Sequence, residues 1–325
     1  MGIKSDMRFC FFLLVFLVAG SSCVERPWHH SAGEYVVVQP SAGQSLDTVA
    51  SDFGGGPAGL PAIEALNPPA LTPANTPLLV PATPAYELGI RAGGYQVVPV
   101  LTYRWVGGAD FEALEARLRA DLLQLQSLGH SLLSPDEFLG FIRMERSVSS
   151  GAVLLAFEVY HAEGFRAFWE RSSDLGLTGL LFIEPSTVGT EGALTWEEVA
   201  RLSGDAMEPA LLPPGGQGLT APASKETLVG YTLRVKETIT TSHGLLAGNV
   251  PGPVRFAAYP DGVGNSVMAS VMVSLGMKGI FISGEEGNPF FCDNLSVVRM
   301  DAGGRGAEVP LDRYLDTFRE AALSW

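Results

Sequence analysis

Glu158 ends an apolar run of the sequence and is the first candidate for a catalytic group. Residues 151–157 are Gly-Ala-Val-Leu-Leu-Ala-Phe, and a helical pattern follows from Glu163 to Leu175. An apolar run of this length before a helix is typical of a buried parallel strand, and the chemistry of such sheets lies just beyond the carboxyl ends of the strands. The carboxylate of Glu158 therefore occupies a place at which a catalytic group would act.

Two further carboxylates follow predicted strands and could act together with Glu158. Glu184 and Asp261 would lie at strand ends of the same sheet or barrel, which is the arrangement of a glycosidase pair. Strand-end carboxylates also cap helices and accept hydrogen bonds from loops, so the sequence leaves both roles open. The sequence contains no HExxH, Gly-x-Ser-x-Gly, CxxC or P-loop motif.

Length and composition indicate a globular protein that does not bind nucleic acid. The chain has 325 residues, 46% of them hydrophobic, which is enough for a large core. Its net charge is -14, and its lysines and arginines are not clustered as phosphate binding requires. The negative charge by itself does not identify a substrate, because carboxylates on a solvated surface are ordinary.

Residues 1–22 predict an export signal. Lys4 and Arg8 precede an apolar segment at residues 9–19, and small residues follow it. The apolar segment is shorter than the about 20 residues that a bilayer-spanning helix needs. The sequence therefore predicts an exported protein of the cell envelope or periplasm.

Cys23 follows the small residues directly and resembles the acylated cysteine of bacterial lipoproteins, although Gly20 stands where those proteins usually have leucine. The resemblance implies a membrane anchor through lipid on Cys23. Ordinary signal cleavage with an incidental Cys23 is the alternative. Acylation would leave Cys292 without a disulfide partner.

Residues 34–82 predict a small α+β module with the order β-α-α-β. Strands at residues 35–38 and 78–81 enclose one helix that begins at Ser45 and another at residues 61–66. A linker rich in proline, alanine and glycine follows at residues 83–94.

The module resembles the LysM domain. The motifs that match are Gly-Gln-Ser-Leu at residues 43–46, Asn-Pro at 67–68 and Leu-Val-Pro at 79–81. The resemblance implies binding of N-acetylglucosamine glycans, chiefly peptidoglycan, in a shallow groove. The groove residues that it implies are Gly43, Gln44, Ser45, Leu46 and Asn75. A module that folds as a spacer and binds nothing is the alternative.

Strands and helices alternate from residue 95 to residue 325. The predicted strands are residues 97–103, 153–157, 179–183, 254–258 and 279–283, and the predicted helices include residues 110–128, 165–175, 225–243, 266–275 and 311–322. Two more helices are expected to begin with capping residues at Ser134 and Thr195. This alternation predicts a parallel α/β sheet, either doubly wound or closed as a barrel.

Residues 95–325 resemble the polysaccharide deacetylase family. The motifs that match in order and spacing are Val-Pro-Val-Leu-Thr-Tyr at 98–103, Leu-Leu-Ala-Phe at 154–157, Leu-Thr-Trp-Glu-Glu-Val at 194–199, Phe-Ala-Ala-Tyr-Pro-Asp-Gly at 256–262 and Gly-Asn-Pro-Phe-Phe at 287–291. The resemblance implies a distorted (β/α) barrel of fewer than eight strands, here preceded by the LysM-like module.

The family removes acetyl groups from sugars with a divalent metal such as zinc. One Asp and two His hold the metal, which activates a water, and a neighbouring Asp takes the proton. By this resemblance Glu158 keeps a carboxylate at the position of the base, whereas Val159, Ala210 and Pro214 stand at the three ligand positions. None of these three side chains can bind a metal, so the resemblance predicts a chain that holds no cofactor.

A rearranged metal site would need other donors and would make the protein an active N- or O-deacetylase, which is the first alternative. The candidate donors are His161, Asp205, Glu208 and Asp261. The family's early Tyr-His pair is likewise changed, to Tyr103-Arg104.

Aromatic side chains are expected at the mouth of the barrel, where their faces could stack on sugar rings. The aromatic residues are Tyr103, Tyr160 and Tyr259, together with Trp105, Phe290 and Phe291, and Pro260 is expected beside them. The sequence therefore predicts glycan binding without catalysis. A structural partner of an envelope protein or polysaccharide machine is the second alternative.

Overall fold

A computed structural model describes most of the chain. The described residues are 28–32, 35–41, 43–53, 60–68, 76–81, 87–91, 94–106, 110–172, 175–205, 207–215, 218–305 and 309–321. The predicted signal peptide (residues 1–22), Cys23 and Asn75 lie outside them. None of the described helices combines the length and the apolar composition that a bilayer-spanning helix needs.

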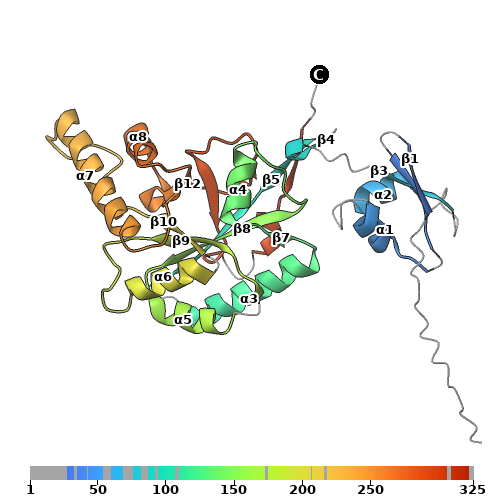
Figure 1. Ribbon diagram of the computed structural model, residues 1–325, viewed down its shortest axis with the longest axis horizontal. Coiled ribbons are helices and arrows are strands. Elements are labelled where there is room, and N and C mark those ends of the chain that lie inside the picture. The colour runs from blue at the N-terminus through green and yellow to red at the C-terminus, as the bar shows by residue number, and fades with distance from the viewer. Residues whose placement is uncertain are drawn as a thin grey trace, which may run out of the picture.

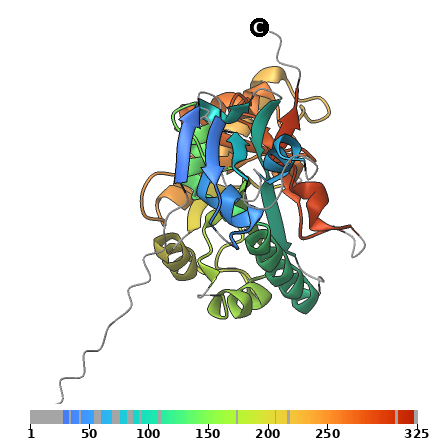
Figure 2. The ribbon, with the colours of Figure 1, turned by 90° about the vertical axis from the view of Figure 1, so that its right-hand side faces the viewer.

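The N-terminal part of the structure contains the four elements expected between residues 34 and 82, and one more strand before them (Figures 1 and 2). The elements are β1 (Trp28–Ala32), β2 (Tyr35–Gln39), α1 (Leu46–Phe53), α2 (Leu60–Leu66) and β3 (Leu78–Pro81). Strand β2 pairs antiparallel with both β1 and β3. The strand β1 was not predicted.

Asn67 links the end of α2 to β3 through side-chain hydrogen bonds. Its side-chain amide donates to the carbonyls of Ile63 and Leu79, each at 2.7 Å, and its Oδ1 accepts from the N–H of Leu79 at 2.9 Å. A small apolar core lies beneath these contacts and comprises Val38, Val49, Ala50, Ile63, Leu78 and Val80.

Seven described strands close into a parallel barrel (Figure 1). In order around the barrel they are β6 (Val100–Trp105), β14 (Val297–Asp301), β12 (Gly279–Ser283), β11 (Phe256–Ala258), β10 (Met207–Leu211), β9 (Gly179–Ile183) and β8 (Ala152–Val159). Pairing of β6 with β8 closes the ring, and the short β7 (Ser131–Leu132) pairs beside β8. The distorted (β/α) barrel expected from the resemblance is confirmed.

Six helices among the described residues connect these strands. They are α3 (Phe111–Ser127), α4 (Pro135–Ile142), α5 (Ala162–Glu170), α6 (Trp196–Asp205), α7 (Leu228–Ala247) and α8 (Ser266–Ser274). Both predicted capping residues are confirmed: Ser134 exchanges hydrogen bonds with Glu137, and Thr195 does so with Glu198. Helices α3 and α5 lie next to each other at the bottom of Figures 1 and 2.

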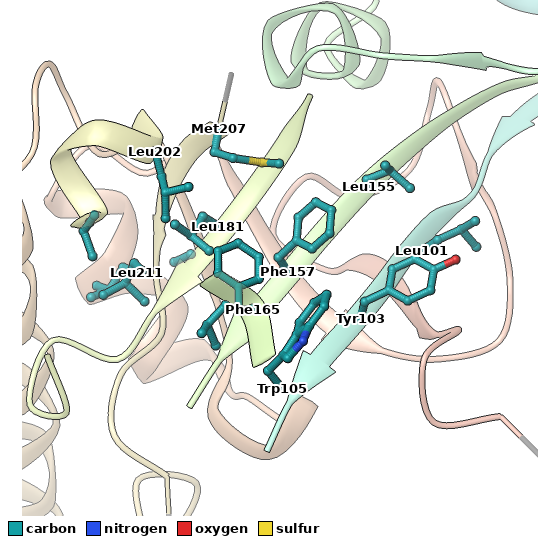
Figure 3. Close-up of a cluster of buried hydrophobic side chains, with 14 of the residues drawn as sticks. Leu101, Tyr103, Trp105, Leu155, Phe157, Phe165, Leu181, Leu202, Met207 and Leu211 are labelled. Carbon is teal, nitrogen blue, oxygen red and sulfur yellow. The ribbon is translucent and has the colours of Figure 1, made fainter. Parts of the chain in front are cut away.

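Side chains of the strands alternate between an inner and an outer apolar layer, because successive residues of a strand point to opposite faces. The outer layer lies between the strands and the helices (Figure 3) and includes Tyr103, Trp105, Phe157, Phe165 and Leu181. The inner layer fills the barrel and includes Val100, Ala156, Phe182, Phe256 and Phe281. The same alternation places Thr102, Arg104 and Glu158 on the inner face at the carboxyl ends of the strands.

The C-terminal helix predicted for residues 311–322 is wrong. A single 3-10 turn (Leu311–Tyr314) is followed by β15 (Phe318–Glu320). This strand pairs antiparallel with β5 (Gly94–Val98), which also pairs with β4 (Ile90–Arg91) and β13 (Asn288–Pro289). Hydrogen bonding to the edge of β5 outweighs the helical pattern of the segment.

Other element boundaries also differ from the prediction; the helix expected at residues 165–175, for example, is α5 and ends at Glu170. The strand expected at residues 97–103 is divided at Pro99, which has no N–H to donate. The helix expected to end at His243 continues through Gly244 to Ala247, with Gly248 as its C-cap, and it begins at Leu228 with Thr227 as its N-cap rather than at residue 225. A glycine inside a helix costs only about 1 kcal/mol, and packing of the helix compensates for it.

Candidate functional site

A pocket of about 620 Å³ lies at the carboxyl ends of the barrel strands; we call it the barrel pocket. Its apolar walls come mainly from the loops after β10 and β11. Its polar side chains are Thr102, Arg104, Glu158, Tyr160, Glu184, Asp261, Ser283, Arg299 and Asp301. This is the face at which (β/α) barrels place their functional groups.

Glu158 lies at the base of the barrel pocket between two arginines. Arg104 faces it in register on β6, and the Nε of Arg104 donates to Oε2 of Glu158 at 2.6 Å. Nη1 of Arg299, on β14, donates to the other oxygen, Oε1. The Glu158 side chain is only 1% exposed. Both oxygens of Glu158 therefore accept from guanidinium groups, and the almost fully buried carboxylate is the centre of an ion-pair cluster.

Arg299 is a buried cation. Its pKa is lowered to about 10, mainly by burial and also by the nearby charge of Arg104, while the charge of Asp301 opposes both effects. An arginine with this pKa is protonated in neutral water. Its guanidinium carbon also lies 5.0 Å from the centre of the Phe182 ring, a cation–π distance. The buried cation that pairs with Glu158 is therefore the guanidinium group of Arg299.

The residues at the expected ligand positions do not fit a divalent metal. Val159 belongs to the outer apolar layer and pairs with Trp105, so its side chain points away from the barrel pocket. Ala210 is fully buried in the inner layer, and Pro214 lies in the loop after β10. Zinc sites need three or four N, O or S donors around one point. Within the described part of the chain, no group of three His, Cys, Asp or Glu residues is placed to hold a metal.

Solved structures of deacetylases share this barrel. A de-N-acetylase from Aggregatibacter actinomycetemcomitans covers 67% of this chain and 99% of its own, with 17% identity and a TM-score of 0.56. The deacetylase PplD of Streptococcus pyogenes covers 69% of this chain and 98% of its own, with 14% identity and a TM-score of 0.57. IcaB from Ammonifex degensii covers 68% of this chain and 95% of its own, with 17% identity and a TM-score of 0.54. The barrel has the deacetylase fold. No family model matches the sequence, and no curated protein matches it.

The other possible metal donors do not converge in this deacetylase fold. The ring of His161 packs against Phe111 at 5.3 Å between centroids. Glu208 lies near the start of β10 and forms an ion pair with Arg255 at 2.7 Å. Only Asp261 lines the barrel pocket. The side chain of Asp205 lies outside the described part of the structure.

The structure separates the three tyrosines that were expected at the mouth. Tyr160 lines the barrel pocket and is half-buried. Tyr259 is almost fully buried, donates to the carbonyl of Leu295 at 3.1 Å, and lines a different hollow beside α8. Tyr103 is fully buried in the outer layer, where its hydroxyl donates to Asp121 at 2.7 Å.

Burial corrects the expected roles of several aromatic residues. A ring without exposed surface cannot stack on a sugar, which excludes Tyr103 and Trp105 from direct glycan contact. Phe290 is buried, and Phe291 lies against Tyr95 at 4.9 Å, beside the strand β5 that precedes the barrel. Of the residues expected at the mouth, only Tyr160 and Pro260 line the barrel pocket, and of these two only Tyr160 is aromatic.

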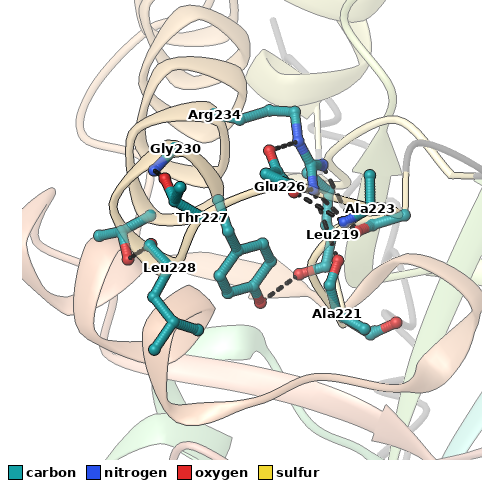
Figure 4. A network of polar contacts seen from close by, with 12 residues as sticks. Leu219, Ala221, Ala223, Glu226, Thr227, Leu228, Gly230 and Arg234 are labelled. Carbon is teal, nitrogen blue, oxygen red and sulfur yellow. Dashed lines mark hydrogen bonds and ion pairs between the residues drawn. The ribbon is translucent and has the colours of Figure 1, made fainter.

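The loop between β10 and α7 forms one wall of the barrel pocket. Side chains of α7 form hydrogen bonds with this loop (Figure 4). The hydroxyl of Tyr231 donates to the carbonyl of Leu219 at 2.7 Å. Arg234 donates from Nε to Glu226 at 2.8 Å and from Nη2 to the carbonyl of Ala221 at 3.4 Å. These contacts hold the loop between β10 and α7, whose described residues form no helix or strand.

The expected glycan-binding positions of the N-terminal module lie between β2 and α1. Gly43 has φ +82°, a turn conformation that favours glycine. The Oε1 of Gln44 accepts from the N–H of Ser41 at 3.1 Å, and Ser45 caps α1 by accepting from the N–H of Thr48 at 3.2 Å. Leu46 is exposed.

Sequence reasoning missed Arg299, Thr102 and Asp301 as members of the site. Arg104 was noticed only as the residue that replaces a histidine. Alternation along strands 100–105 and 297–301 could have indicated that these side chains share the inner face with Glu158. The pairing of Arg299 with Glu158 joins residues 141 positions apart and depends on closure of the barrel.

Proposed function

We propose that this protein binds glycans of the cell envelope and that its barrel does not deacetylate them. The observation that carries the proposal is the pairing of Glu158 with two arginines, because each oxygen of the residue at the position of the base accepts a hydrogen bond from one of them. Aliphatic side chains at Val159, Ala210 and Pro214 support it, because a deacetylase of this type needs a metal-bound water.

The barrel pocket has the properties of a sugar site. Its volume of about 620 Å³ can accommodate a sugar ring and parts of its neighbours. Planar charged side chains such as Arg104 and Glu184 can each bind sugar hydroxyls through two atoms. The ring of Tyr160 offers an aromatic face. The chemistry of these groups fits polymers of N-acetylglucosamine, including peptidoglycan.

Three measurements on the purified protein test the proposal. Calorimetry with chitohexaose should detect binding, elemental analysis should find no stoichiometric zinc, and incubation with chitohexaose or peptidoglycan should release no acetate. Stoichiometric zinc together with acetate release would instead establish an active deacetylase with a rearranged site. Co-purification of an envelope protein, without any glycan binding, would favour a structural role.

For the N-terminal part we propose peptidoglycan binding of the LysM type, through the turn before α1. Replacement of Gln44 and Leu46 by alanine should lower the amount of protein that sediments with purified cell wall. Glu64→Gln, on an exposed position of α2, is the matched control and should leave sedimentation unchanged. If the alanine variant and Glu64→Gln sediment equally with cell wall, the N-terminal part does not bind peptidoglycan through this turn and acts as a spacer.

We further propose that the exported chain is anchored by lipid on Cys23. The Cys23→Ser variant should move from the membrane fraction to the soluble fraction of cells. Retention of this variant in the membrane fraction would contradict the anchor.

A further inference from the structure

Two further hollows adjoin the barrel pocket, and we call the three together the groove. A hollow of about 270 Å³ beside α3 shares Arg104, Val106 and Asp301 with it. A second hollow, of about 450 Å³ beneath the loop after β10, shares Pro260 and Asp261. Because they share lining residues, the three hollows adjoin one another at the carboxyl ends of the strands.

The barrel pocket carries an excess of negative charge. Four carboxylates and two guanidinium groups line it, which gives a formal charge of -2. Both guanidinium groups bind one carboxylate, that of Glu158. None of the ion pairs among the described residues includes Glu184, Asp261 or Asp301. A cleft lined in this way attracts a cationic ligand.

Two of these carboxylates act on the same group of the pocket. Burial raises the pKa of Tyr160, Arg104 lowers it, and the charges of Glu184 and Asp261 raise it again. The hydroxyl of Tyr160 therefore lies within electrostatic range of both carboxylates. Gly262 allows this position of Asp261, because a side chain at residue 262 would overlap the hydroxyl of Ser283.

Two buried polar atoms of the barrel pocket have no hydrogen-bond partner among the residues that the structure describes. The hydroxyl of Thr102, a residue only 2% exposed, has none, and neither has the Nε of Arg299, a residue 7% exposed. Both residues line the pocket. Buried polar atoms are normally hydrogen-bonded, so these two indicate a ligand that brings its own polar atoms. The hydroxyls of a sugar can accept from Arg299 and can either donate to or accept from Thr102.

We propose that the barrel pocket selects a de-N-acetylated amino sugar, a unit of the glycan with a free ammonium group. The ammonium group faces Glu184 and Asp261, and hydroxyls of the same unit bind Thr102 and Arg299. An N-acetyl group removes the positive charge and leaves these carboxylates without a cation. The inference rests on the proposed function, since it specifies which glycan unit the barrel binds.

The test compares two oligomers of equal length, chitohexaose and hexaglucosamine. It uses the exported chain with Cys23→Ser and, to remove the binding proposed for the N-terminal part, with Gln44→Ala and Leu46→Ala. Calorimetry at low salt should give an affinity for hexaglucosamine about tenfold higher than for chitohexaose, a difference that salt reduces. The double variant Glu184→Gln/Asp261→Asn should lose most of this preference. The matched control Glu197→Gln/Glu237→Gln removes two exposed carboxylates outside the groove and should keep it.

Thr102→Val distinguishes failure of the inference from failure of the proposed function. This variant keeps the shape of the side chain and should lower the affinity for both oligomers, with thermal denaturation reporting that it folds. If Thr102→Val lowers binding but the two oligomers bind equally, the inference is overturned and the proposed function stands. If Thr102→Val changes the affinity for neither oligomer, both the inference and the proposed function of the barrel are overturned. A preference that survives Glu184→Gln/Asp261→Asn also overturns the inference.

Discussion

Arg104 and Glu158 lie opposite each other on β6 and β8, and the Nε of Arg104 donates to Oε2 of Glu158 at 2.6 Å. The second oxygen of Glu158 accepts from Arg299 on β14, which is the other neighbour of β6. A single carboxylate therefore joins three adjacent strands above the inner apolar layer. The cluster occupies the base of the barrel pocket and fixes its shape.

Glu158→Ala is expected to destabilise the fold. The change leaves Arg299 buried without its anion, and breaking a buried ion pair in this way costs about 3–5 kcal/mol. Arg104→Ala should cost no more than about 1 kcal/mol, because 45% of the Arg104 side chain is exposed and Arg299 still pairs with Glu158. Chemical denaturation of the two variants measures the difference in the free energy of unfolding.

A double variant separates loss of charge balance from loss of packing. Glu158→Leu/Arg299→Met replaces the buried pair by apolar side chains and should recover most of the stability that Glu158→Ala loses. Equal stability of Glu158→Ala and Arg104→Ala would contradict the buried pair.

Tyr103 and Tyr160 should differ in their effects on glycan binding. Tyr103→Phe removes the hydrogen bond to Asp121, which keeps its contacts with Arg305, and should lower stability by about 1 kcal/mol. It should leave glycan affinity unchanged, because the ring is fully buried. Tyr160→Ala removes an aromatic face of the barrel pocket and should lower the affinity for chitohexaose severalfold. Calorimetry and thermal denaturation of both variants provide the comparison, and loss of binding in Tyr103→Phe would contradict the assignment.

Local patterns predicted the parallel sheet well, whereas its closure as a barrel was expected only from the family resemblance. Capping residues such as Ser134 and Thr195 act within one turn of helix, and the apolar run before Glu158 needs only its own strand. The alternation of such segments was enough to predict a parallel sheet. The C-terminal segment was mispredicted because its structure depends on β5, more than 200 residues earlier in the chain.

The site was predicted less completely because long-range pairing creates it. Glu158 was identified from its place at a strand end, but its partner Arg299 comes from the last strand of the barrel. The face to which a residue points was also decisive. Tyr103 and Arg104 are neighbours in sequence, yet alternation puts one in the outer layer and the other in the barrel pocket.

Glu198 should contribute stability that depends on pH. A hydrogen bond from Arg166 is the main cause that lowers its pKa to about 2, burial opposes this, and hydrogen bonds from Thr195 lower it further. A depressed pKa stabilises the folded state fully above the ordinary carboxyl value of 4.5, and the contribution disappears as pH falls through about 2. Comparison of the native chain with Glu198→Gln should therefore show a difference of about 1 kcal/mol at pH 6 that shrinks between pH 4.5 and 2.

The choice of glutamine isolates the charge, because Gln at the third helical position preserves the capping arrangement with Thr195. Glu197→Gln, at the exposed neighbouring position, removes a carboxylate without removing the contacts of Glu198 and is the matched control. Equal pH profiles of the native chain and Glu198→Gln would contradict the pairing with Arg166.

Val159→Asp should destabilise the protein without creating a metal site. Val159 lies in the outer apolar layer beside Trp105, so a carboxylate there is buried without a partner and costs about 3 kcal/mol or more. Val159→Ala, the control for lost volume alone, should cost less. Thermal denaturation with and without equimolar zinc should show no shift for the native chain or for either variant. A rise in the Tm of Val159→Asp on zinc addition would mean that residue 159 faces the barrel pocket, and the assignment of the two layers at the end of β8 would then be wrong.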